Sequence, residues 1–184
     1  MSEINAGLNE YNEALELLNE KLKAQGEYIE IRAVGGYAML YNNLRSGGYT
    51  VDVDTATEEY PQTVKDMIVE VSKEKGLEED WINNDVCSLV EVMEIIDELE
   101  WTEDESYSNI KLFVATRLTL LKLKIRAVHY GGLVPRITDK LDLLDLLSIF
   151  DVHNINELEK LDVTKDLEEQ YPRCYMFLKE QSEW

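Results

Sequence analysis

The stretch Tyr49-Thr-Val-Asp-Val-Asp-Thr55, which follows a glycine pair at Gly35-Gly36, is the part of this sequence that predicts both fold and site. Side chains alternate sides along a strand, so a strand here directs the two valines one way and both aspartates the other. The carboxylates of Asp52 and Asp54 then lie roughly 7 Å apart along one edge. Carboxylates arranged in this way suit a pair of divalent cations, as in sites of phosphoryl transfer.

The glycine pair lies between a predicted strand, Tyr28–Val34, and a predicted short helix, Tyr37–Leu44. Backbone amides at such a junction point outward and attract anions, and glycine lets a phosphate approach the backbone closely. Each motif alone is common in structural turns and exposed strands. Together they provide what a nucleoside triphosphate with bound magnesium requires, so the combination indicates a nucleotide site.

The hydrophobic pattern predicts an α+β protein. Residues 1–115 are expected to form a mixed β-sheet flanked by helices, and residues 116–184 a helical part packed on this core. The first helix is amphipathic and ends near Gly26, and Gly76 ends another helix that starts at Pro61. The other expected elements are strands at Thr50–Thr55, Met93–Trp101 and Tyr107–Ala115, and helices at 116–128, 139–150, 155–160 and 165–181.

The net charge of −20 argues against broad, non-specific binding to nucleic acid. The segment 111–140 is the exception, because it holds seven basic residues and one acid, Asp139. Two interpretations stay open: these cations neutralise the protein's own carboxylates, or they face a phosphate-rich partner such as RNA. No apolar run reaches the ~18 residues of a membrane span, and the cysteines form no CxxC pair, so we expect a cytoplasmic protein with free thiols.

The segments Ala33–Met39 and Thr50–Asp54 resemble the signature of the nucleotidyltransferase-fold superfamily. The resemblance is strongest to the minimal bacterial nucleotidyltransferases allied to abortive-infection toxins, in which a Gly-Gly or Gly-Ser pair precedes an Asp-x-Asp strand. Three further segments resemble family motifs in the same order: Glu79–Asn84 a tryptophan-bearing loop, Leu118–Leu123 a leucine-rich helix with one lysine, and Asp142–Asp145 a helix with spaced aspartates.

This resemblance implies a nucleotidyltransferase-like sheet and a metal-dependent reaction. A nucleotidyl group would pass from a nucleoside triphosphate to an RNA, protein or small-molecule acceptor, with Mg2+ or Mn2+ as cofactor. The toxin-like relatives also imply an antitoxin partner. The implied metal ligands are Asp52 and Asp54; the implied nucleotide-binding residues are Gly35, Gly36, Arg45 and Lys122; and the implied catalytic residues are Asp52, Asp54, Lys122, Asp142 and Asp145.

In these implied roles, Lys122 balances the charge of the triphosphate, while Asp142 or Asp145 orients Lys122 or activates the acceptor. The alternative for Lys122 is a structural ion pair with an acid on the next helix. For the aspartates, the alternative is a solvated helix face. Three aromatic residues near the C-terminus are spaced as a packing face, either for the core or for a homodimer: Tyr171, Tyr175 and Phe177.

The sequence also departs from the family pattern. Gly48 stands where relatives often carry an arginine, and Arg45 is the candidate replacement. No third carboxylate can be assigned from the pattern, although Glu98 and Glu100 lie in a predicted strand. These departures favour an alternative, in which the chain is a catalytically inactive binding or regulatory protein that keeps the fold.

Overall fold

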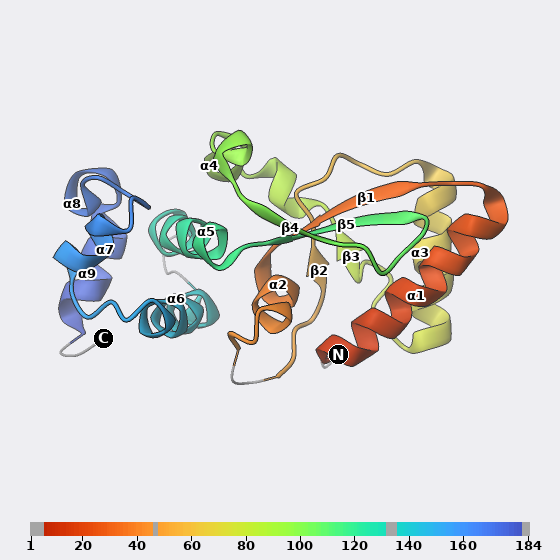
Figure 1. Cartoon of the computed structure of the whole chain (residues 1–184), viewed down its shortest axis with the longest axis horizontal. Helices are drawn as coiled ribbons and strands as arrows, with labels where there is room; N and C mark the ends of the chain where they lie inside the picture. The colour runs from red at the N-terminus through yellow and green to blue at the C-terminus, as the bar shows by residue number, and fades with distance from the viewer. Residues whose placement is uncertain (1–5, 46–47, 132–135, 182–184) are drawn as a thin grey trace. The chain divides into compact units, whose positions relative to one another are not determined.

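The computed structural model describes residues 6–45, 48–131 and 136–181, and its elements are drawn in Figure 1. The chain divides into two compact units, Met1–Thr116 and Arg117–Trp184. Within the described residues, strands occur in the first unit and the second is helical. The protein is therefore α+β, with a small mixed sheet.

The first unit is organised around two groups of strands. β1 (Ile29–Ala33) pairs in parallel with β5 (Ile110–Ala115), and β5 pairs antiparallel with β4 (Trp101–Asp104). The second group is the parallel pair β2 (Val53–Asp54) and β3 (Ile82–Asn83). An antiparallel bridge connects the two groups. It joins Ala33, the last residue of β1, to Thr55, the residue directly after β2.

The two long helices of this unit end where local sequence signals place their ends. α1 (Leu8–Gln25) ends at Gly26 and α3 (Gln62–Lys75) ends at Gly76, both glycines being left-handed, as the sequence predicts. α1 and α3 pack side by side (Figure 1). Asn19 on α1 accepts a hydrogen bond at 2.7 Å from the backbone N–H of Asn109, which ties α1 to the start of β5. The shorter helices are α2 (Gly35–Tyr41), η1 (Asp85–Ser88), α4 (Val90–Met93) and η2 (Ile96–Glu98).

The strand predicted over Met93–Trp101 is wrong, because this region forms helical turns in α4 and η2. Its buried apolar residues are Val92, Ile95 and Leu99. They recur at intervals of three and four, which is the period of a helix and not of a strand. The strand itself starts only at Trp101.

Other predicted elements differ in extent, and two of them differ most. The strand expected over Thr50–Thr55 is reduced to Val53–Asp54, with single bridges at Thr50 and Thr55. The last predicted helix, 165–181, is broken into α8 (Leu167–Gln170) and α9 (Pro172–Glu180). The break falls at Tyr171, because the residue before a proline is driven out of the helical region.

The second unit is built around one long helix. α5 (Arg117–Tyr130) packs against both α6 (Ile137–Ile149) and α9. The short helix α7 (Ile155–Lys160) lies where the sequence predicts it. No helix of the described residues is both long and apolar enough to cross a membrane. The core side chains of α5 and α6 are Leu120, Leu121, Ile125, Val128, Leu143, Leu146 and Leu147.

Candidate functional site

The bend between β1 and α2 lies directly against one of the two aspartates. Gly35 has a positive φ of 58°, which glycine adopts without strain. A Cβ atom at this position would overlap Oδ2 of Asp54. The backbone N–H of Val34 also donates to the carbonyl oxygen of Asp54 at 2.9 Å. The structure therefore brings the glycine bend and the carboxylate of Asp54 together, and only a residue without a side chain fits between them.

The second glycine is in close contact with two polar side chains. A Cβ atom on Gly36 would overlap Oγ1 of Thr50 and would lie 2.6 Å from Nη1 of Arg45. Arg45 in turn donates from Nη1 to the carbonyl oxygen of Tyr49 at 3.3 Å. The guanidinium group thus lies beside the bend, where the charge of an arginine can reach a bound anion.

Asp52 lies just before β2 and is held from the neighbouring strand. Its Oδ2 accepts a hydrogen bond at 3.0 Å from Nδ2 of Asn83 on β3. Asn83 is also the register partner of Asp54 in the parallel β2–β3 pair. Sequence analysis did not assign Asn83 to the site, because it interpreted Glu79–Asn84 as a tryptophan-bearing loop. The signal that could have revealed β3 is the apolar pair Trp81-Ile82, both of which are buried.

A buried aromatic cluster lies close to the two carboxylates. Tyr11 of α1 stacks on Trp81 with ring centroids 6.2 Å apart, and its hydroxyl donates to the carbonyl oxygen of Thr50 at 3.4 Å. Burial raises the pKa of Tyr11, and the negative charges of Asp52 and Asp54 raise it further. Both carboxylates therefore act on one phenol, which stays neutral and cannot serve as a base near neutral pH.

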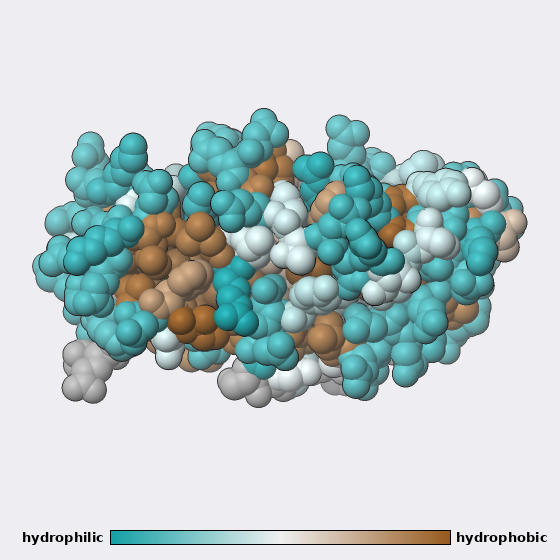
Figure 2. Space-filling view, viewed as in Figure 1, coloured by the Kyte–Doolittle hydropathy of each residue, from teal (hydrophilic) through white to brown (hydrophobic). Residues whose placement is uncertain are grey.

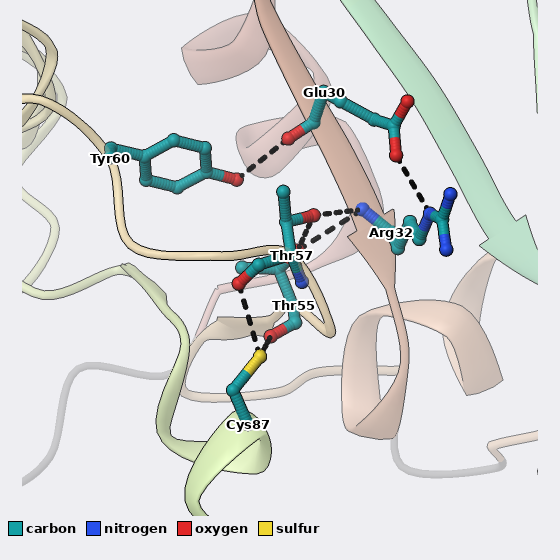
Figure 3. Close-up of polar contacts among 6 residues, drawn as sticks. All are labelled: Glu30, Arg32, Thr55, Thr57, Tyr60 and Cys87. Carbon is teal, nitrogen blue, oxygen red and sulfur yellow. Dashed lines mark hydrogen bonds and ion pairs between the residues drawn. The ribbon is translucent and has the colours of Figure 1, made fainter. Parts of the chain in front are cut away.

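The chain that follows Asp54 is fixed by a second polar network (Figure 3). The backbone N–H of Arg32 donates to Oγ1 of Thr55 at 3.1 Å and to Oγ1 of Thr57 at 2.9 Å, and the two hydroxyls lie 2.8 Å apart. The Cys87 thiol donates to the carbonyl oxygen of Thr57 at 3.1 Å. Burial raises the pKa of Cys87, and the charge of Glu58 adds to this effect, so the thiol keeps its proton. The network ties β1, the segment after β2 and η1 together.

The candidate metal ligands that the sequence predicts are the carboxylates of Asp52 and Asp54. Among residues 6–45, 48–131 and 136–181, no three His, Cys, Asp or Glu side chains are grouped so that they could hold a metal ion. Glu98 lies in η2 and Glu100 precedes β4, both exposed, so the predicted strand that would have carried a third acid is absent. Mg2+ is commonly bound by one or two carboxylates together with substrate phosphates, so the assignment of Asp52 and Asp54 as metal ligands stays a prediction.

The second unit contains a buried ion-pair cluster that sequence analysis assigned to a different lysine. Nζ of Lys124 lies 2.8 Å from Oδ1 of Asp139 and 2.7 Å from Oδ2 of Asp142, and all three side chains are buried. Arg136 adds a contact to Asp139 at 2.9 Å. Burial alone would raise the pKa of Asp139, but Lys124 and Arg136 outweigh it and hold this pKa below its ordinary value. The lysine that binds the acids of α6 is thus Lys124, two residues beyond the predicted Lys122.

This cluster corrects the interpretation of the polar stripe on α6. Asp142 is only 3% exposed, so it does not belong to a solvated helix face. Its contact with Lys124 supports the packing of α5 against α6. Lys122 and Asp145 are half-buried in the second unit, and their implied roles stay predictions.

Other cations of the segment 111–140 rest on aromatic rings of their own unit. The distances to ring centroids are 4.8 Å for Lys111 over Phe113, 5.3 Å for Arg126 over Tyr171 and 5.2 Å for Lys140 over Phe177. Lys124 and Arg136 are in ion pairs with aspartates of the second unit. For Lys124 and Arg136, these contacts favour the interpretation in which the cations neutralise the protein's own carboxylates. Comparison with known proteins found no matching family model, curated protein or solved structure.

Proposed function

We propose that this protein transfers a nucleotidyl group from a nucleoside triphosphate to a hydroxyl acceptor, with a divalent cation as cofactor. The observation that carries this proposal is the close approach of the Gly35 backbone to the Asp54 carboxylate. In this proposal, phosphate oxygens meet the backbone amides of the bend on one side and the carboxylates on the other. The resemblance in the order of glycine bend and Asp-x-Asp supports the same reaction.

In this proposal the amides of Gly35 and Gly36 and the guanidinium of Arg45 bind the phosphates. Asp52 and Asp54 hold Mg2+ or Mn2+, which when bound neutralises phosphate charge. The oxygen of the acceptor hydroxyl forms a bond to the α-phosphorus, and the bond from that phosphorus to the bridging oxygen breaks. Pyrophosphate leaves, and the hydroxyl proton passes to Asp52 or Asp54.

The acceptor would be an RNA 3′ end, a protein hydroxyl or a small molecule, with a toxin-like role and an antitoxin partner as the resemblance implies. The net charge of −20 disfavours a long RNA, because its phosphates would be repelled. The proposed involvement of Lys122, Asp142 and Asp145 is weaker than that of the glycine bend, since Asp142 already binds Lys124.

The decisive experiment is incubation with nucleotides labelled at the α-phosphate, Mg2+, and either total RNA or total protein as acceptor. Wild type is expected to label one acceptor class, and the Asp52→Asn, Asp54→Asn double variant is expected to lose the label. The matched control is Glu79→Gln with Asp80→Asn, which removes two exposed acids beyond α3 and should leave labelling intact. Equal labelling by wild type and the Asp52, Asp54 variant would refute the proposal.

The second candidate function is a non-catalytic module that binds a nucleotide or regulates a partner. It is favoured by Asn83, a neutral side chain on the strand next to the Asp-x-Asp, which donates to Asp52 and stands in register with Asp54. Titration calorimetry with Mg2+ and each nucleotide distinguishes the two. Binding that depends on Asp52, without transfer to any acceptor, would support the non-catalytic function.

A further inference from the structure

One helix of the second unit exposes a continuous apolar stripe. Ile137 is 73% exposed and Leu141 is 55% exposed, and Leu144 on the same side is half-buried. The opposite side of α6 is occupied by the core leucines and by the two aspartates that bind Lys124. Figure 2 shows hydrophobic surface gathered over this part of the unit. Exposed apolar stripes of this kind typically mark a contact with another protein surface.

The spacing of the stripe matches the seam of two paired helices. Ile137, Leu141, Leu144 and Ser148 follow intervals of four, three and four residues, which are the d and a positions of a heptad. Lys140 then falls at a g position and Asp145 at the e position five residues later. In a parallel pair of helices, g of one chain faces e of the other, so a lysine meets an aspartate on both sides of the seam.

We propose that α6 binds α6 of a second copy of this chain in a parallel, two-fold symmetric pair. The apolar stripes of the two copies form the centre. Lys140 of each copy lies beside Asp145 of the partner subunit. In a two-fold antiparallel pair, the edge that carries Lys140 would face the same edge of the other copy, and the edge that carries Asp145 would do likewise. Like charges would then lie together, so the parallel arrangement is favoured.

The distribution of charge also favours association through this unit. Arg117–Trp184 contains 10 basic and 12 acidic side chains, a net charge of −2 out of the −20 of the whole chain. The first unit therefore carries −18 and repels its own copies. The second unit is the part of the molecule through which two copies meet with the least repulsion.

The size of the stripe sets the strength of the pair. α6 has 13 residues and its stripe contains three apolar side chains, so the contact falls below the roughly 1,200 Å² that stable complexes bury. The dimer is accordingly expected to be reversible and to form at high micromolar concentration. The proposal is independent of nucleotide transfer, so either can fail without the other.

Sedimentation equilibrium of the full chain over a range of concentrations tests the association. Wild type is expected to shift from monomer to dimer, and Leu141→Glu is expected to stay monomeric. Val90→Glu is the matched control, because Val90 is 67% exposed on α4 of the first unit and lies outside the stripe. Circular dichroism checks that each variant is folded. A monomeric wild type, or a Leu141→Glu variant that associates like wild type, would overturn the proposal.

The parallel arrangement has its own test. Lys140→Glu is expected to weaken association about two- to tenfold, and adding Asp145→Lys in the same chain should restore it. Ser148→Cys should form a disulfide with itself under oxidation beyond the background of wild type, because a positions face each other in a parallel pair. Cross-linking that requires a mixture of Ile137→Cys and Ser148→Cys chains would show an antiparallel pair and refute this geometry.

Discussion

Replacing Lys124 by methionine tests the buried cluster between α5 and α6. Methionine keeps the unbranched apolar stem of lysine and removes only the ammonium, which lies 2.8 Å from Asp139 and 2.7 Å from Asp142. Removing one member of a buried ion pair costs about 3–5 kcal/mol, because the remaining charge loses its partner without regaining water. Total stabilities of about 5–15 kcal/mol make this a large loss. We expect Lys124→Met to lower the free energy of unfolding of the second unit by that amount.

Urea denaturation followed by circular dichroism measures the loss. Hydrogen exchange of the α5 and α6 amides assigns it to the second unit, since two units can unfold separately. Lys122→Met is the matched control, because Lys122 lies on the same helix and is half-buried; its cost is expected below about 1 kcal/mol. Replacing Lys124, Asp139 and Asp142 together by apolar residues should recover most of the loss. Equal losses for the two lysine variants would refute the reasoning.

The same cluster predicts opposite pH dependences for wild type and variant. In wild type the folded pKa of Asp139 is depressed, so its ionised form stabilises the fold above its ordinary pKa and this contribution is lost as the pH falls through the folded pKa. In Lys124→Met, Asp139 stays buried but loses the ammonium that lowers its pKa, so this pKa rises and protonation at low pH relieves the unpaired buried charge. The difference in free energy of unfolding between wild type and Lys124→Met should therefore narrow from neutral pH toward about pH 4. A difference that widens over this range would contradict the assignment of Lys124 as the partner of Asp139.

Three further outcomes follow from the described contacts. Gly35→Ala should lower the free energy of unfolding in urea by about 2–4 kcal/mol, because the strain of a left-handed alanine adds to the overlap with Asp54. Gly76 has a similar φ but lies in open space, so Gly76→Ala should show the cost of the strain alone. Asn83→Asp should tighten Mn2+ binding in calorimetry, because it places a third carboxylate next to Asp52 on the neighbouring strand; weaker binding would exclude a metal at this position. Burial raises the pKa of Cys174 to about 12, so mass spectrometry should find this thiol unmodified by iodoacetamide at about pH 8 in the folded chain and alkylated in urea.

The elements that sequence analysis predicted well are those whose signals are local. The ends of α1 and α3 follow from Gly26 and Gly76, because only glycine adopts a left-handed conformation without strain. The prediction of a strand over Met93–Trp101 failed because the scattered apolar residues of this acidic stretch were interpreted with the two-residue repeat of a strand. The spacing of Val92, Ile95 and Leu99 shows that the helical period was present in the sequence.

The site was predictable only in part. The glycine pair and Asp-x-Asp were identifiable from their order along the chain, and the structure brings Gly35 against Asp54. Asn83 was not identifiable, because it reaches Asp52 through the pairing of β2 with β3 across 31 residues. The Thr55 and Thr57 hydroxyls were missed for the same reason, since they bind the backbone of β1 from a distant segment.

The sequence by itself determined the α+β composition, the glycine bend and the helix ends, because each depends on the conformational preferences of a few neighbouring residues. The tertiary structure alone decided which lysine meets Asp142. Lys122 and Lys124 are both on α5, but they point about 200° apart around the helix axis, and only the packing of α5 against α6 selects the inward one. A short-range pattern specifies a local conformation, whereas the partner of a buried charge depends on how whole helices pack.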